Sequence, residues 1–315
     1  MCRVPRKLLK IKYNIIYNFK KIMYMIKKKR GIKLEEYKIR IQNAKQAIKN
    51  ADYILIGAGA GLSTAAGLEY NGEGFQRDYK EFIEKYHFED LYTASFYPFS
   101  SQEEKWAFWA RLIKLNRFGE PLKLYQELLE FVKDKNYFVI TTNVDGQFET
   151  AGFDKEKIFA VQGDYRFLQC ENACHNQLYD NQEMVEEWLK HTKDCKIPSH
   201  LVPKCPVCGG NMEMNLRKDA NFVQDENWYK QAKQYDQFLD EIKDKNVILL
   251  EMGVGFNTPG IIRFPFEQMT YQHLKTTLIR MNKDYPMVSQ EIQNKTISFD
   301  EDIHQIIADV KEKSL

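Results

Sequence analysis

Four cysteines fall in two close pairs, Cys170-x3-Cys174 and Cys205-x2-Cys208, with thirty residues between the pairs. In a chain without a convincing signal peptide, this spacing is typical of a four-thiolate zinc site rather than of disulfides. Four sulfurs leave no coordination position for water, so the predicted Zn²⁺ would be structural. Free buried cysteines are the alternative. His175 and Cys195 are nearby, but we do not assign them as ligands.

A second set of candidate residues follows three apolar runs, in GAGAGLS, TTNVDG and MGVGFN. In the first, the glycines around Ala60 would let backbone N–H groups approach a pyrophosphate, although tight packing alone also explains such a turn. In the second, Asn143 and Asp145 lie two apart and so project to one side. That polar pair is either a turn cap or part of a site.

The apolar runs predict six strands, within ADYILIGAGAG, NYFVITTNVDG, KIFAVQG, NVILLEMGVGF, TTLIRMN and TISFD. Helical patterns lie between or beside them, in LEEYKIRIQNAKQAIKN, KLYQELLEFVKDK, ENWYKQAKQYDQFLDEIKDK and EDIHQIIADVKEK. This alternation predicts an α/β fold with a doubly wound, Rossmann-like parallel sheet. In such a sheet ligands bind at the carboxyl ends of the strands, where the candidate residues lie.

Two segments interrupt the alternation. Residues 166–214 contain the four paired cysteines and are predicted to be a small zinc-ribbon insert, while residues 75–120 are rich in aromatic residues and are predicted to form a helical side module or lid. The predicted Rossmann-like domain is therefore split into residues 33–165 and 215–315. Residues 1–32 form a separate basic leader.

The net charge of +2 conceals a basic leader on an acidic body. Residues 1–30 carry eleven of the 46 Lys and Arg and no acid, which leaves 35 basic against 44 acidic residues, or about −9, in the rest. An acidic body argues against nucleic acid as the main partner.

The leader could be a targeting or membrane-surface segment, a disordered tail, or a translated stretch upstream of a start at Met23 or Met25. No run is long and apolar enough for a membrane span, so we expect a cytoplasmic protein.

Taken together, these motifs resemble the sirtuin family over roughly residues 33–312. The resemblance is carried by the glycine turn with Ser63 and Gly67, the Asn143-x-Asp145 pair, a glycine at position 163, the cysteine pairs, Gly253-x-Gly255 and Asn282. It implies NAD as co-substrate. The positions that would bind NAD are Gly59, Ala60, Gly61, Ser63, Gly67, Asn143, Asp145, Gln162, Gly253, Gly255 and Asn282.

The chain departs from the common sirtuin pattern at informative places. Gln162 stands where the family's catalytic histidine is expected, Leu68–Gly72 replaces an Ile-Pro-Asp-Phe-Arg segment, and Gln147-Phe148 replaces Leu-His. These departures resemble the macrodomain-linked class M sirtuins. That resemblance implies mono-ADP-ribosylation of a lipoyl-carrier protein related to the glycine cleavage H protein, with reversal by a partner macrodomain hydrolase.

A glutamine at position 162 favours transfer of ADP-ribose over deacylation. Sirtuin deacylation needs a general base to resolve an imidate, and a side-chain amide has no accessible proton equilibrium. Loss of a general base costs about 10²–10⁴ in rate, whereas a competent nucleophile can still take the ADP-ribose. We therefore predict Asn143, Asp145, Gln162 and Arg217 as the catalytic group. Arg217 would clamp the acceptor or a ribose, although a surface arginine is the alternative.

Three functions thus remain open. The first is an NAD-dependent protein ADP-ribosyltransferase, the second a deacylase that works without the histidine. The third is an inactive module that binds NAD or ADP-ribose, against which the presence of both Asn143 and Asp145 argues.

Overall fold

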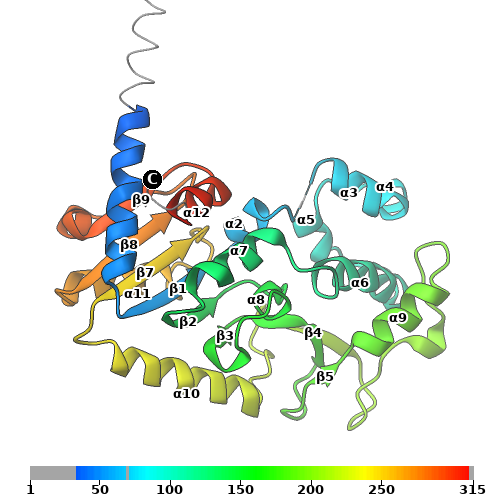
Figure 1. Cartoon of the computed structure of the whole chain (residues 1–315). Coiled ribbons are helices and arrows are strands. Elements are labelled where there is room, and N and C mark those ends of the chain that lie inside the picture. Colours follow the sequence, from blue (N-terminus) through cyan, green and yellow to red (C-terminus); the bar gives the residue numbers. More distant parts are fainter. Residues whose placement is uncertain (1–32, 69–70, 312–315) are drawn as a thin grey trace, which may run out of the picture.

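The computed structural model describes residues 33–68 and 71–311 of the chain, so the basic leader and residues 69–70 lie outside the described part. Six parallel strands form the central sheet in the order β3-β2-β1-β7-β8-β9 (Figure 1). Their bounds are β1 Tyr53–Ala58, β2 Asn136–Thr141, β3 Ile158–Ala160, β7 Val247–Met252, β8 Thr276–Met281 and β9 Thr296–Phe299. All five neighbouring pairs are parallel. The predicted doubly wound sheet is confirmed, because each of the six apolar runs supplies a strand.

Helices cover both faces of this sheet. The helix at residues 33–50, α7 (Lys123–Val132) and α12 (Ile303–Lys311) share a core with Ile54 and Ile56 of β1. On the other face, α10 (Glu226–Glu241) and α11 (Arg263–Gln272) pack with Leu55. Successive side chains of a strand point to opposite faces, so an uninterrupted apolar run is what a sheet covered on both sides requires.

A second lobe is built from the two segments that interrupt the alternation (Figure 1). A three-stranded antiparallel sheet has the order β5-β4-β6. The elements of the lobe are α3 Glu73–Asp78, α4 Lys80–Tyr86, α5 Leu91–Ser95, α6 Gln102–Asn116, β4 Gly163–Cys170, β5 Tyr179–Asp180, α9 Gln182–His191 and β6 Met212–Leu216. One aromatic-rich core joins α3–α6 to β4, α9 and β6, and the rings of Trp106 and Trp188 lie 5.0 Å apart within it.

Two short helices lie between these parts of the fold. α2 (Ala60–Ala65) follows β1 directly, and α8 (Gln147–Thr150) follows the loop after β2. Both begin at the strand ends where the candidate residues were predicted.

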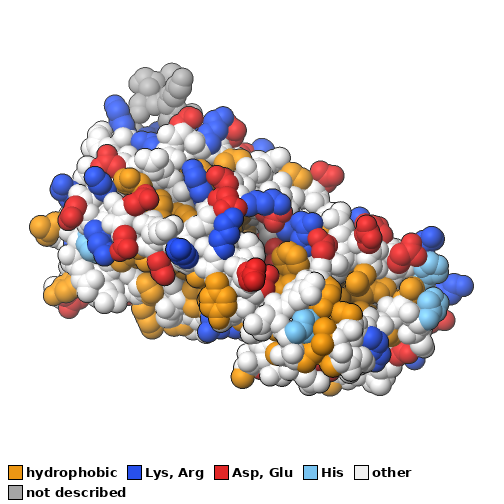
Figure 2. Space-filling model, turned by 90° about the horizontal axis from the view of Figure 1, so that it is seen from below, with side chains coloured by type: hydrophobic (Ala, Val, Ile, Leu, Met, Phe, Trp, Pro, Cys, Tyr) orange, Lys and Arg blue, Asp and Glu red, His pale blue; other side chains and the backbone are white. Residues whose placement is uncertain are grey.

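The surface below α10 and the second lobe carries mixed charge. Figure 2 shows Lys and Arg interspersed with Asp and Glu across this face rather than gathered by sign. In the described part of the chain, no helix combines the length and the apolar composition that crossing a bilayer demands.

Candidate active site

A cleft of about 1300 Å³ opens at the carboxyl ends of the parallel strands, next to the second lobe. This is the position at which doubly wound sheets bind their ligands. Ten of the predicted site residues line it: Gly59, Ala60, Gly61, Asn143, Asp145, Gln162, Arg217, Gly253, Gly255 and Asn282. Ser63 and Gly67 do not belong to its lining.

The glycine turn after β1 forms part of the floor of the cleft. The N–H groups of Gly59 and Gly61 donate to the carbonyls of Met252 and Gly253, each over 3.0 Å. A Cβ on either glycine would lie 2.7 Å from an atom of Gly253, so no side chain fits between the turns after β1 and β7. The glycines therefore allow a close approach of the two backbones, and both turns line the cleft.

Ser63, Asn143 and Asp145 form a buried hydrogen-bonded group next to that turn. Ser63 Oγ donates to Asp145 Oδ2 over 2.5 Å, and the backbone N–H of Gln147 donates to Asp145 Oδ1 over 3.0 Å. Asn143 Nδ2 lies 3.1 Å from both Gly59 O and Ser63 Oγ. Both carboxylate oxygens of Asp145 thus accept hydrogen bonds from the protein. Burial raises the pKa of this carboxyl group, while the bond from Ser63 acts in the opposite direction.

Gly67 ends the helix that carries Ser63. Its φ is +101°, and its N–H donates to Thr64 O over 3.0 Å. A glycine suits this position because it adopts a positive φ without a steric penalty. In this structure Gly67 thus shapes the turn after α2, outside the cleft lining.

Gln162 and Arg217 meet on the side of the cleft next to the second lobe. The backbone N–H of Arg217 donates to Gln162 O over 3.0 Å, and both residues line the cleft. Gln162 is half-buried and Arg217 is exposed. The bond forms because β4 begins directly after Gln162 and pairs with β6, which ends directly before Arg217.

Asn282 fixes the loop after β8 to the loop after β7. Its Nδ2 donates to Val254 O over 2.8 Å. Its Oδ1 accepts the backbone N–H groups of Asp284 at 3.1 Å and Tyr285 at 2.9 Å. The side chain therefore shapes this end of the cleft through three backbone contacts.

The wall of the cleft formed by the second lobe also contains residues that the sequence analysis did not identify. Glu213 accepts from Lys105 at 2.8 Å and lies 2.7 Å from the ammonium group of Lys218, and all three residues line the cleft. The aromatic side chains Trp109, Tyr92, Phe96 and Tyr97 line the same wall. The only sequence signal for this wall was the aromatic richness of residues 75–120.

Arg117 is a further residue that the sequence analysis did not identify. Its guanidinium is buried and contacts Asp164 at 2.7 Å and Glu149 at 2.8 Å. Burial raises the pKa of Asp164, and Arg117 opposes that rise. Because Asp164 lies two residues after Gln162, this ion pair supports the start of β4 beneath the cleft.

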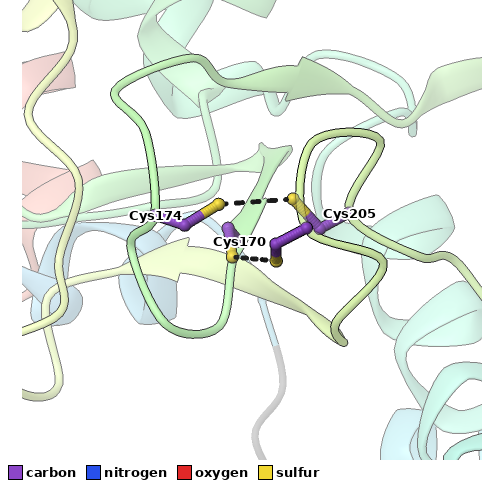
Figure 3. Close-up of side chains that lie close together, drawn as sticks. Cys170, Cys174 and Cys205 are labelled. Atoms are coloured by element: carbon purple, nitrogen blue, oxygen red, sulfur yellow. Dashed lines mark hydrogen bonds between the residues drawn. The ribbon is translucent and has the colours of Figure 1, made fainter.

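The four predicted cysteines come together in space. Their sulfurs all lie within 4.8 Å of one another, and Figure 3 shows the two loops facing each other. Two sulfur–sulfur distances are 3.7 Å (Cys170 to Cys208) and 3.6 Å (Cys174 to Cys205). A tetrahedral ion with sulfur ligands at 2.3 Å would require sulfur–sulfur distances of roughly 3.8 Å. The cluster could therefore hold a metal ion.

Comparisons with known proteins agree with this architecture. The profile of the Sir2 family matches residues 59–250. A "Protein ADP-ribosyltransferase" of Staphylococcus aureus is 38% identical over 263 residues, which cover 83% of this chain and 84% of that protein. A "Probable bifunctional ADP-ribose hydrolase/ADP-ribosyltransferase" of Fusarium oxysporum is 31% identical over 243 residues, covering 72% of this chain and 39% of the relative.

A solved structure described as "Structural Basis for the Mechanism and Regulation of Sir2 Enzymes" has the same fold. It superimposes with a TM-score of 0.51 at 18% identity, covering 86% of this chain and 98% of the other. The sirtuin resemblance inferred from the motifs is thereby confirmed, and the chain belongs to the Sir2 family.

Proposed function

We propose that this protein is an NAD-dependent protein mono-ADP-ribosyltransferase, which transfers ADP-ribose from NAD to a protein acceptor and releases nicotinamide. The observation that carries the proposal is Gln162, which lines the same cleft as Asn143 and has no proton-accepting group. The names of the Staphylococcus aureus and Fusarium oxysporum relatives support the same activity.

The proposed reaction exchanges one bond at the ribose. The glycosidic bond between nicotinamide and C1′ breaks and its electron pair leaves with nicotinamide. A lone pair of the acceptor forms the new bond to C1′, and the acceptor's proton passes to solvent. Positive charge develops at C1′ in between, so oriented dipoles around it accelerate the step. Asn143 is our candidate for this role and for orienting the ribose, because its amide is fixed by Gly59 and Ser63.

Deacylation would require a further step for which the cleft offers no base at position 162. A ribose hydroxyl would have to lose its proton, and a glutamine can hold that hydroxyl but cannot accept the proton. ADP-ribosyl transfer avoids this step when the acceptor is itself a competent nucleophile. The backbone N–H of Arg217 donates to Gln162 O, which places Arg217 beside Gln162. We propose that the guanidinium of Arg217 holds the acceptor or a ribose.

For the acceptor we propose a lipoyl-carrier protein related to the glycine cleavage H protein, on the class M resemblance. A macrodomain hydrolase is the proposed opposing partner, and the paired activities in the name of the Fusarium oxysporum relative support it. We propose a cytoplasmic location for the reaction. For the cysteine cluster we propose Zn²⁺, because thiolate sulfurs at these distances suit a tetrahedral structural ion.

The test uses purified protein, NAD labelled in the adenylate part, a lipoylated H-like carrier protein and an acetylated peptide. We expect label on the carrier and no deacetylation of the peptide. Asn143→Ala should abolish transfer and leave the unfolding temperature close to that of wild type. Deacetylation without transfer would identify a deacylase, and binding of NAD without release of nicotinamide would identify an inactive binding module.

Gln162→His separates the role of this residue from that of the rest of the cleft. We expect no robust deacylase activity from this variant, because the segment from Leu68 to Gly72 also departs from the family pattern. A gain of deacylation of about 10² or more would instead mean that the single missing base decides the reaction.

A further inference from the structure

Tyr125 is a fully buried residue of α7 that lies next to the Ser63–Asn143–Asp145 group. Its hydroxyl is 2.8 Å from Ser63 Oγ and 3.3 Å from Asn143 Nδ2. The side chain is not part of the cleft lining, so any effect on a bound ligand would pass through these two neighbours.

The direction of each hydrogen bond follows from counting hydrogens. A serine hydroxyl has a single hydrogen, and that of Ser63 is directed to Asp145 Oδ2, only 2.5 Å away. The hydrogen between Ser63 and Tyr125 must therefore come from the phenol. Tyr125 donates to Ser63, and its oxygen is left to accept from the amide of Asn143.

This arrangement fixes which way the amide of Asn143 faces. Its two N–H hydrogens are directed to three acceptors on the protein side, Gly59 O, Ser63 Oγ and Tyr125 Oη. Among the described hydrogen bonds Oδ1 of Asn143 accepts none from the protein, and Asn143 lines the cleft, so Oδ1 is available to accept a hydrogen bond from a ligand.

The phenol is itself held in place. Its ring packs edge-on against Phe148, with centroids 4.9 Å apart. Gln147 Oε1 accepts the backbone N–H of Leu122 at the start of α7 over 3.0 Å, and the backbone N–H of Gln147 binds Asp145. Thus α7 contacts α8 at two points, through the bond from Leu122 to Gln147 and through the ring of Tyr125 on Phe148, and these contacts hold the hydroxyl of Tyr125 beside its partners.

We propose that Tyr125 is a positioning residue for cleavage of the nicotinamide bond: together with Gly59 O and Ser63 Oγ its hydroxyl sets the orientation of the Asn143 amide, and it holds the hydrogen of Ser63 on Asp145. This inference rests on the proposed function, since it assigns Tyr125 a part in the same reaction.

The test compares Tyr125→Phe with Tyr137→Phe. Each variant removes one hydroxyl from a buried tyrosine of the same core, and each ring packs edge-on against a phenylalanine. Among the described hydrogen bonds, the hydroxyl of Tyr137 accepts only one, from the backbone N–H of Asp154 at 3.2 Å. Tyr137 lies outside the cleft lining. Nicotinamide release from NAD is measured in both, with kcat and KM determined separately.

We expect kcat of Tyr125→Phe to fall about tenfold, which corresponds to the net free energy of about one to two hydrogen bonds. KM for NAD should stay within about threefold of wild type. Tyr137→Phe should stay within about twofold in both constants.

An unchanged kcat in Tyr125→Phe, or an equal fall in kcat in the control Tyr137→Phe, would overturn the inference alone. A wild-type protein that releases no nicotinamide would overturn the proposed function and this inference with it. The two failures are therefore distinguished by the wild-type measurement.

Discussion

Gly163 offers a stability prediction whose size can be worked from the structure. Its φ is +97°, and a Cβ built on it would lie 1.9 Å from the backbone oxygen of Asn215 on β6. Gly152 has almost the same φ, +96°, but a Cβ there would meet nothing closer than Leu129 Cδ2 at 3.5 Å. The two glycines thus share the backbone strain that alanine would bring and differ in the space available.

Gly163→Ala should therefore cost much more than Gly152→Ala. Positive φ at a non-glycine residue costs on the order of 1–3 kcal/mol at either position. Overpacking adds typically about 1–3 kcal/mol, and here the obstacle is the backbone of a paired strand. We expect Gly163→Ala to lose about 2 kcal/mol more of the free energy of unfolding than Gly152→Ala, measured by urea titration with a common slope.

Gly163→Ala should also reduce enzymatic activity beyond its effect on folding. Displacing the start of β4 disturbs the bond between Gln162 O and the N–H of Arg217. Nicotinamide release is therefore expected to fall in Gly163→Ala at temperatures where the protein is still folded, and to persist in Gly152→Ala. Equal losses of stability in the two variants would refute the reasoning from the close approach of the Asn215 backbone to Gly163.

Three further predictions concern buried charge, pH and metal. Arg117→Met leaves Asp164 buried without its partner and should lower the free energy of unfolding by about 3–5 kcal/mol in urea titration; a loss below about 1 kcal/mol would contradict this. The hydroxyl of Ser100 and two nearby lysines lower the pKa of Glu104 from 4.5 to about 2, so its stabilisation is present above pH 4.5 and is lost as pH falls toward 2. Glu104→Gln should therefore show a smaller change in melting temperature than wild type across that window. Removal of bound metal by a chelator should lower the melting temperature and expose about four more reactive thiols, whereas unchanged thiol reactivity would argue against a cysteine-bound ion.

The sheet could be predicted from the sequence because its strands are covered on both faces. Five of the six residues of β1 are buried, and those of β7 are all buried, so β1 appears as an unbroken apolar run and β7 as one interrupted only by Glu251, which is paired with Arg280. α11 was not among the predicted helices. It contains Pro265 as its third residue, a position where the missing N–H costs no intrahelical bond, and only three of its residues are buried. The local pattern therefore gave little indication of a helix.

The cleft could be predicted only in part, because some of its contacts join residues that lie far apart in the sequence. Asn143, Asp145 and the glycines follow strands, and parallel strands bring their carboxyl ends together whatever the details of packing. Tyr125 meets Ser63 from 62 positions away, and Arg117 meets Asp164 from 47 positions away. Such contacts depend on how a helix packs on the sheet, and this packing cannot be predicted from the local spacing of residue types.

The cysteine cluster and the cleft are two ends of one structural unit. β4 runs from Gly163, next to Gln162, to Cys170, and β6 runs from Met212, shortly after Cys208, to Leu216, next to Arg217. The two strands pair along this length, with an irregularity between Gly163 and Leu168. A metal ion at the cysteines would hold the far ends of both strands together and so help to keep Gln162 and Arg217 in register, although it would touch neither. Its loss should thus impair ADP-ribosyl transfer through geometry, and added metal should restore transfer and stability together.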